Sequence, residues 1–338
     1  MEKKLTKYRI AVLGCGAIFN RHLSAINANK DNFELIGVFD PDTELLQKQT
    51  QQLKVKLYKN ENEVYLDNEI NCIVILSPSH LHFLQAMKAL KHKKNVILEK
   101  PATFLAYEID ELELCAKVND VNIFCILQVR LNPSVIIVKQ LLEQQLLGKI
   151  RGVSLIQRWQ RPISYFSGWR GSMKTGGGIL REFAIHYLDV LQYLVGMPSV
   201  LSASFYNTKF IDFDTNDTIY ALLNFKHFGG SVEITISSEP KNLECSLSIM
   251  GEYGFIKLGG KSLDEISTAD FLSNDIKNQF NLIEESVMAK EIKDFVNQGS
   301  CPHHPELYKQ ISIKPKLFTL NQTFNVIKLI EEIYKLRK

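Results

Sequence analysis

The sequence predicts an α/β protein in which a doubly wound parallel sheet is followed by an α+β domain with a large, mainly antiparallel open sheet. Short apolar runs alternate with amphipathic stretches through the first 125 residues, which is typical of βαβ units. After about residue 150 the apolar runs lengthen and are separated by turns that contain glycine. A length of 338 residues suits two domains. We therefore expect one domain over residues 1–126 and a second over residues 127–338.

The first domain begins with the strand "RIAVLG" and the helix "RHLSAINAN". A second strand, "FELIGVFD", and a third, "INCIVILSP", continue the alternation. These strands are nearly continuous runs of Val, Ile and Leu, as expected where helices cover both faces of a parallel sheet.

The second domain contains the strand "RGVSLIQRWQR" and the helix "GILREFAIHYLDVLQYLVG", which Gly196 and Pro198 should end. The stretch "NFKHFGGSVEI" predicts a hairpin around Gly229 and Gly230. Two amphipathic helices, "QFNLIEESVMAKEIKDFVNQG" and "NQTFNVIKLIEEIYKLRK", should close the chain.

Composition and charge exclude several classes of function. Lys and Arg number 40 against 37 Asp and Glu, a net charge of +3, which argues against a dedicated nucleic-acid binder. No stretch approaches the ~20 apolar residues of a membrane span, and "MEKKLTKYRI" lacks the apolar core of a signal peptide. The six cysteines show no C-x-x-C spacing. We expect a soluble cytoplasmic protein with reduced thiols and no membrane or nucleic-acid partner.

A glycine-rich turn joins the first strand to the first helix, and its residues are Gly14, Cys15, Gly16, Ala17, Ile18 and Phe19. The glycines permit a tight turn and a close approach of pyrophosphate to the helix N-terminus. Asp40 ends the second strand, where a carboxylate binds the adenosine ribose and repels a 2′-phosphate. This pattern predicts an NAD site and favours NAD over NADP. Phe19 replaces the usual third small residue, so its ring should point away from the strand or hold the helix further out. Asp42 is the better candidate to cap the next helix.

Four further motifs carry a family resemblance. They are "LEKP" at 98–101, "SPSHLHFLQAMKAL", "LQVRLNP" at 127–133 and "GGGILREFAIHYLDVLQYLVG" at 176–196. Together with the glycine turn they resemble the Gfo/Idh/MocA family of nicotinamide-dependent sugar oxidoreductases. The resemblance implies a Rossmann domain followed by a substrate-binding domain whose open sheet often carries subunit contacts. It therefore also implies a homo-oligomer, either a dimer or a tetramer.

The resemblance implies roles for individual residues. Lys100 matches the family's catalytic lysine and His186 its catalytic histidine, while Glu182 stands where many members have Asp, Asn or Gln. The remaining cofactor contacts would come from Ser77, Pro78, His82, Glu99 and Gln128, with Glu99 beside the nicotinamide ribose and Gln128 near the carboxamide.

Within the family, "RPISYFSGWRGSMKTGGG" resembles the nucleotide-sugar 3-dehydrogenases. Those enzymes oxidise the C3 hydroxyl of UDP-N-acetylglucosamine or of its uronic acid. Substrate contacts are then expected from Arg130, Tyr165, Trp169, Arg170 and Asp189. The family often opens its last helix with an acidic-small-Arg triplet, and this chain has "NQT" at 321–323 instead.

The residues themselves suit alcohol oxidation, which removes a proton from oxygen and a hydride from carbon. Lys100 follows a parallel strand, at the edge where ligands of open α/β sheets bind. Glu182 and His186 are four residues apart, which places them on one face of a helix, and Asp189 is near enough to orient the imidazole. No third ligand accompanies the Glu182–His186 pair, so no metal is predicted. His303 and His304, near Cys301, are interpreted as a surface loop.

Other functions fit the same motifs. An NADP-linked keto-sugar reductase or a polyol dehydrogenase would share the fold. A non-catalytic dinucleotide sensor is a third possibility, which Phe19 and the "NQT" triplet slightly favour. Arginines and aromatic residues gather at 158–170, where they would suit a uridine diphosphate or form a structured surface loop.

Overall fold

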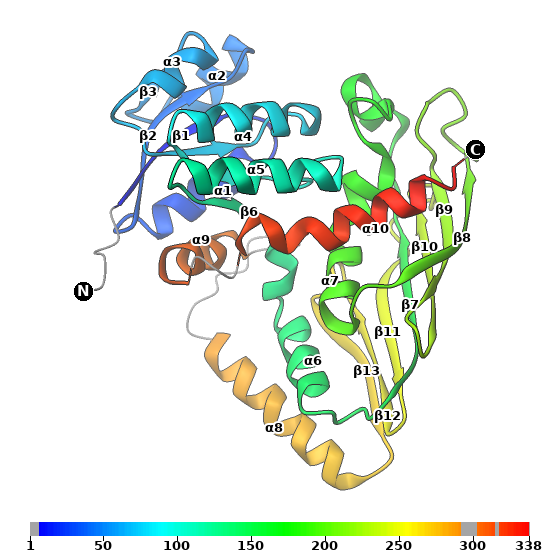
Figure 1. Ribbon diagram of the computed structural model, residues 1–338. Coiled ribbons are helices and arrows are strands. Elements are labelled where there is room, and N and C mark those ends of the chain that lie inside the picture. The colour runs from blue at the N-terminus through cyan, green and yellow to red at the C-terminus, as the bar shows by residue number, and fades with distance from the viewer. Residues whose placement is uncertain (1–6, 292–302, 315–317, 338) are drawn as a thin grey trace. The chain divides into compact units, whose positions relative to one another are not determined.

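The computed structural model describes residues 7–291, 303–314 and 318–337. The chain forms two compact units (Figure 1). The first comprises Met1–Ile126 with His304–Phe324, and the second comprises Leu127–His303 with Asn325–Lys338. The sequence placed everything after residue 126 in the second domain, whereas in the structure residues 304–324 pack with the first unit.

A six-stranded parallel sheet forms the centre of the first unit, in the order β3-β2-β1-β4-β5-β6. Its strands are β1 (Tyr8–Leu13), β2 (Phe33–Phe39), β3 (Lys56–Leu57), β4 (Cys72–Ile75), β5 (Asn95–Leu98) and β6 (Ile123–Cys125). Every residue of β4 is buried, as expected where both faces are covered. The strand order reverses between β1 and β4, which is where a doubly wound sheet binds its ligand. The predicted fold class is confirmed for this unit.

Helices cover this sheet, and not all of them were predicted. Those predicted are α1 (Phe19–Ala28), α2 (Thr43–Thr50), α4 (His82–Lys91) and α5 (Ala106–Val118). The short α3 (Glu61–Leu66) and η1 (Ser79–Leu81) between them were not. The additional helix, α9 (His304–Ile313), packs against α1. The ring of Tyr308 lies 5.1 Å from that of Phe33, centroid to centroid, and is fully buried. The segment that follows ends in η7 (Leu320–Thr323), which contacts α5.

The second unit is built on a seven-stranded sheet with the order β13-β12-β11-β7-β10-β9-β8. Its strands are β7 (Ile150–Arg158), β8 (Ser199–Tyr206), β9 (Thr218–Asn224), β10 (Gly229–Thr235), β11 (Glu244–Gly251), β12 (Gly254–Gly259) and β13 (Glu265–Phe271). All neighbours are antiparallel except β7 and β10. The predicted hairpin is confirmed as β9–β10, but its turn is Phe225–Phe228, with Lys226 at φ 65°, and the two glycines open β10.

The helices of the second unit include a π-helical turn, η5 (Leu180–Ala184), directly before α7 (Ile185–Val195). The others are η2 (Gln128–Leu131), α6 (Pro133–Glu143), η3 (Ile163–Phe166), η4 (Gly168–Gly171), α8 (Asn274–Glu291) and α10 (Phe324–Tyr334), whose first residue belongs to the first unit. Helix α6 packs against both α7 and α8. Within the described ranges, no helix combines the length and the apolar character needed to cross a membrane.

A buried ion pair joins η2 to α7. Arg130 donates from Nε to Asp189 Oδ2 at 2.7 Å and from Nη2 to Asp189 Oδ1 at 2.6 Å. Gln192 adds a hydrogen bond to the same carboxylate, and the guanidinium carbon lies 4.5 Å from the centre of the Tyr193 ring. Arg130 is 8% exposed and Asp189 2%. Because both charges are buried and matched bidentately, the pair fixes the helix that carries His186.

We expect Asp189→Asn to lower the free energy of unfolding by about 3–5 kcal/mol, because the substitution leaves a buried guanidinium without its charge partner. Urea unfolding followed by circular dichroism measures the change. Asp212→Asn, at an exposed position of the same unit, is the matched control and should change stability by less than ~0.5 kcal/mol. Unchanged stability combined with a raised KM for the sugar would instead assign Asp189 to substrate binding.

Candidate active site

The glycine turn after β1 has the geometry of a dinucleotide loop. Gly14 has φ 101°, and a Cβ there would lie 2.9 Å from both the carbonyl carbon of Leu76 and the amide nitrogen of Ser77. At Gly16, by contrast, a Cβ would meet no atom within 4 Å. Helix α1 follows without a side-chain cap, and the amides of Phe19 and Arg21 donate to the carbonyl oxygens of Gly16 and Ile18 at 3.1 and 3.0 Å, so the positive end of the helix dipole faces this turn. The turn therefore fits a pyrophosphate.

Phe19 is buried, with 1% of its surface exposed. As the first residue of α1 it occupies the position of the small third residue of the fingerprint. Its ring contributes to the core of the unit rather than lining an exposed surface. The bulky residue is therefore accommodated by packing, and the open space at Gly16 remains.

Asp40 is held at the end of β2 by two backbone amides. Cys15 N–H donates to Asp40 Oδ2 at 2.7 Å, and Asp42 N–H donates to Asp40 Oδ1 at 2.9 Å. Each carboxylate oxygen keeps a lone pair for a ribose hydroxyl. Asp42 caps α2 through the amide of Leu45, as predicted. This arrangement fits the adenosine ribose of NAD.

The five described cysteines are free, and four of them are buried: Cys15, Cys72, Cys125 and Cys245. Cys301 lies outside the described residues. Burial, reinforced by the charge of Asp40, raises the pKa of the Cys15 thiol to about 12. The Cys15 thiol is therefore protonated at neutral pH and contributes bulk rather than reactivity to the glycine turn.

His82 ties together the two loops at the carboxyl edge of the sheet. Its Nδ1 lies 2.7 Å from the carbonyl oxygen of Pro101, and its Nε2 lies 2.9 Å from that of Ser77. The ring is 1% exposed. Burial lowers the pKa of His82, while the two carbonyl contacts oppose that shift. His82 therefore holds the Ser77–Pro78 loop next to the segment that follows β5.

Glu99 and Lys100 follow directly after β5. Glu99 is 7% exposed, and its Oε2 accepts the backbone N–H of Lys100 at 3.0 Å. Its Oε1 lies 3.0 Å from His22 Nε2 and 3.6 Å from His304 Nε2. Burial alone would raise the pKa of Glu99, but the hydrogen bond from His22 and the proximity of His304 outweigh burial and hold that pKa well below its usual range. An ionised carboxylate therefore precedes Lys100 at the ligand-binding edge.

The sequence missed this cluster. The interpretation of His303 and His304 as a surface loop is wrong, because the two residues are 4% and 1% exposed and His304 begins α9. His22 and Tyr308 were not singled out either. Their spacing along the chain gave no signal, since His22 and Tyr308 are 286 residues apart and meet only in the fold.

Glu182 lies in the π-helical turn that precedes His186. In a regular α-helix, residues four apart lie on one face. The π turn has more residues per turn, so the spacing from Glu182 to His186 does not place the two side chains on one face in the same way. The carboxylate of Glu182 accepts a hydrogen bond from Arg170 Nε at 3.0 Å and another from the hydroxyl of Tyr165 at 2.8 Å. Such π turns are frequent at functional sites.

Arginines stack on aromatic rings next to this turn. The arginine–aromatic cluster consists of Trp159, Arg161, Tyr165, Trp169, Arg170 and Phe183. The guanidinium carbon of Arg161 lies 4.6 Å from the centre of the Trp159 ring, and that of Arg170 lies 4.3 Å from the Trp169 ring. Arg158, in the same stretch of sequence, instead forms ion pairs with Glu233 and Glu244 on the sheet.

Arg161 carries an unmatched charge. Its Nη1 donates to the carbonyl oxygen of Gln160 at 2.6 Å, and no carboxylate of the described residues lies within ion-pair distance of its guanidinium. Burial lowers the pKa of Arg161. Arg170, by contrast, is neutralised by Glu182. A partly buried cation without an anion is costly, so the cluster is suited to receive an anionic group.

Arg130 and Asp189 were predicted to contact substrate, and the structure shows the charged end of each bound to the other. Gln128 is 5% exposed, and its amide oxygen is buried without a hydrogen-bond partner among the described residues. An orphaned amide oxygen of this kind fits a ligand with N–H donors, such as a carboxamide.

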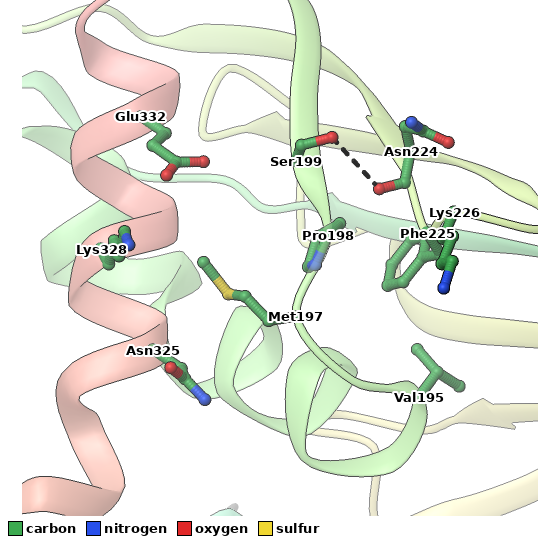
Figure 2. Close-up of a pocket in the computed structure, with 10 residues that line it drawn as sticks. All are labelled: Val195, Met197, Pro198, Ser199, Asn224, Phe225, Lys226, Asn325, Lys328 and Glu332. Atoms are coloured by element: carbon green, nitrogen blue, oxygen red, sulfur yellow. Dashed lines mark hydrogen bonds between the residues drawn. The ribbon is translucent and has the colours of Figure 1, made fainter.

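A pocket of about 560 Å³ lies elsewhere in the second unit (Figure 2). Its lining includes Met197 and Pro198 after α7, Asn224 and Lys226 around the β9–β10 turn, and Lys328 on α10. Figure 2 shows Ser199 bonded to the carbonyl oxygen of Asn224 across one wall. None of the predicted site residues lines this pocket, so we do not place the chemistry there.

Comparison with known proteins agrees with the fold and the loop geometry. The solved WlbA dehydrogenase from Bordetella pertussis, in complex with NADH and UDP-GlcNAcA, is 25% identical with a TM-score of 0.87, over 98% of this chain and 95% of that one. A levoglucosan dehydrogenase solved with NADH and levoglucosan shares the fold at 18% identity and a TM-score of 0.81, over 98% and 97%. Among curated relatives, scyllo-inositol 2-dehydrogenase (NADP(+)) IolW of Bacillus subtilis is 22% identical over 98% of this chain and 94% of its own length. The chain spans about half, 53%, of two further relatives, uncharacterized oxidoreductases of Synechocystis sp. and Streptococcus pneumoniae.

Two family models match the chain. The model of the oxidoreductase family with an NAD-binding Rossmann fold matches residues 8–126, and that of the GFO/IDH/MocA C-terminal domain matches residues 135–257. Together these matches span most of the chain, in the order in which the two units follow one another. The chain therefore belongs to the Gfo/Idh/MocA family of oxidoreductases.

Proposed function

We propose that this protein is an NAD-dependent dehydrogenase that oxidises a secondary hydroxyl of an anionic sugar, at C3 of a UDP-N-acetyl sugar, to the keto-sugar. The observation that carries the choice of substrate is the unmatched guanidinium of Arg161. It belongs to the same unit as His186 and is stacked within the arginine–aromatic cluster. A diphosphate or a uronic acid carboxylate would supply the missing negative charge.

The first unit would hold NAD. Gly14 and Gly16 would cradle the pyrophosphate, and Asp40 would accept the ribose hydroxyls. The carboxylate of Asp40 disfavours the 2′-phosphate of NADP by charge repulsion. Bound nicotinamide supplies the acceptor for the hydride that leaves the sugar carbon.

The chain's own residues would handle the proton. Lys100 and His186 share the removal of the proton from the sugar hydroxyl, Lys100 from the ligand-binding edge of the parallel sheet and His186 from the first turn of α7. Arg170 and Tyr165 orient Glu182, which contributes negative charge next to α7, the helix that carries His186. The Bordetella pertussis relative, solved with NADH and UDP-GlcNAcA, supports by analogy the choice of cofactor and of substrate class.

The alternative is a dehydrogenase of an uncharged polyol with NADP, as the printed name of the Bacillus subtilis relative describes for that protein. Asp40 and Arg161 both weigh against it, because the first repels a 2′-phosphate and the second has no role in binding a neutral polyol.

We also propose a homo-oligomer, since several large apolar side chains of the second sheet are exposed, among them Tyr206, Tyr220, Leu222, Met250 and Phe255.

Asp40→Asn should weaken NADH binding by about tenfold, roughly 1.4 kcal/mol, and strengthen NADPH binding, because the charge is lost while the acceptor for the Cys15 amide is kept. Nucleotide fluorescence titration measures both dissociation constants. Asp42→Asn is the control, since Asp42 caps α2 and should leave the NADH-to-NADPH ratio unchanged. An equal ratio in Asp40→Asn and the unmodified protein would contradict the ribose assignment.

Arg161→Met keeps the apolar stem on the rings and removes the charge. We expect the KM for UDP-N-acetylglucosaminuronate to rise about 10- to 100-fold while kcat stays within a few-fold, because a charge-assisted bond to a bound anion contributes ~1.5–3 kcal/mol. Arg151→Met, at an exposed position of β7, is the matched control. Turnover of scyllo-inositol with no effect of Arg161→Met would support the polyol alternative.

Lys100→Met and His186→Asn should each lower kcat by about 10²–10⁴-fold with NADH binding retained, because each removes a group that handles the proton. If both groups act on one hydroxyl, the double variant should be no slower than the slower single variant. Steady-state kinetics of the three variants and an NADH titration decide the matter. Unchanged turnover in Lys100→Met would reject the assignment of that residue.

A further inference from the structure

Four residues from three distant parts of the sequence form a chain of hydrogen bonds inside the first unit. The hydroxyl of Tyr308 lies 2.8 Å from His22 Nδ1, and His22 Nε2 lies 3.0 Å from Glu99 Oε1. The other oxygen of Glu99 accepts the backbone N–H of Lys100 at 3.0 Å. His22 and Tyr308 are both fully buried. The chain of bonds thus runs from α9 through α1 to the residue that follows β5.

One assignment of protons satisfies every member. The Lys100 amide can only donate, so Glu99 accepts there, and an ionised Glu99 accepts again from His22 Nε2–H. The Nδ1 of a neutral His22 is then an acceptor, and the Tyr308 hydroxyl donates to it. Burial lowers the pKa of His22, despite the opposing effect of Glu99, and raises that of Tyr308 well above its usual value. Both shifts agree with a neutral imidazole and a protonated phenol.

We propose that Tyr308 and His22 are positioning residues for the catalytic edge, holding Glu99 in the rotamer that fixes the backbone of Lys100. Neither residue touches the reacting atoms in this proposal. The segment 304–324, although distant in sequence, is then part of the machinery that presents Lys100. The inference rests on the proposed function, in which Lys100 handles the substrate proton.

A metal ion is the competing explanation of the same residues. One ligand atom from each of His22, Glu99 and His304 lies within 4.8 Å of the other two. The hydrogen-bonded arrangement accounts better for the geometry, because both ring nitrogens of His22 have partners at hydrogen-bond distance. Metal content is therefore included in the test.

The pH dependence follows from the groups around Glu99. The titratable and charged groups that face it or its partners are Arg21 and His22 from α1, His82 from α4, Lys100 from its own strand end, His304 and Tyr308 from α9, and Cys72 from β4. In the unmodified protein the lowered pKa of Glu99 keeps the carboxylate ionised at neutral pH. Removal of the His22 donor leaves only the Lys100 amide and His304 to oppose burial, which raises the pKa, so we expect Glu99 to become protonated as the pH falls towards neutrality.

The experiment compares His22→Leu, His22→Gln and Tyr308→Phe with the unmodified protein. We expect His22→Leu to lose NADH affinity and kcat progressively between about pH 8 and pH 6, a limb absent from the unmodified protein. His22→Gln, whose side-chain amide can donate to Glu99, should remove most of that limb. Tyr308→Phe should lower kcat about 3- to 10-fold with KM for NAD changed less than about 2-fold. His92→Leu, at an exposed histidine, is the control.

Each outcome decides one question. A pH profile of His22→Leu that matches the unmodified protein overturns the positioning role, and so does equal loss in His22→Leu and His22→Gln. One equivalent of bound metal in the purified protein, lost in His304→Ala, overturns it in favour of a metal site. If the unmodified protein binds NADH but oxidises no sugar, the proposed function fails, and the pH dependence of NADH binding still tests the positioning role. If His22→Leu does not fold, Tyr308→Phe and His22→Gln decide through the kcat and KM changes.

Discussion

A carboxylate buried at the carboxyl edge of the parallel sheet constrains much of the first unit. An ionised group removed from water costs several kcal/mol unless donors surround it. Glu99 obtains one donor from the next residue along the chain and another from α1, while His304 of α9 lies 3.6 Å from the same carboxylate. This requirement gives a physical reason for residues 304–324, which follow most of the second unit in sequence, to pack with the first unit. It also explains how a helix with little predictive signal of its own becomes part of the core.

Three of the arginines in the second unit differ in their surroundings. Arg130 is neutralised by Asp189 in the interior, and Arg170 by Glu182 beside the π turn. Arg161 is partly buried among aromatic rings and has no carboxylate partner among the described residues. A matched buried pair holds its two elements rigidly together. An arginine without an ion pair can instead form one with a bound anionic ligand. The distinction makes Arg161 a better candidate than Arg130 for the anion contact of the proposed function, whereas the sequence had named Arg130 among five candidate substrate contacts.

Local patterns predicted most of the fold. The alternation of apolar strands and helices, the glycine turn and the Asp42 cap all depend on residues close in sequence. The sequence did not reveal the Arg130–Asp189 pair, the Glu99 cluster or α9, because their partners are 59 to 286 residues apart. The π turn at Leu180–Ala184 was hidden for another reason, since its apolar spacing also satisfies a regular helix. The residues that resembled family motifs were found, and those that support them were not.

The triplet at 321–323 illustrates how a departure from the family pattern can be accommodated. Asn321 donates its backbone N–H to Glu113 Oε1 at 2.8 Å, and the hydroxyl of Thr323 donates to the carbonyl oxygen of Leu320 at 2.7 Å. The bond to Glu113 anchors η7 against α5 without an arginine, and the bond between Thr323 and Leu320 lies within η7.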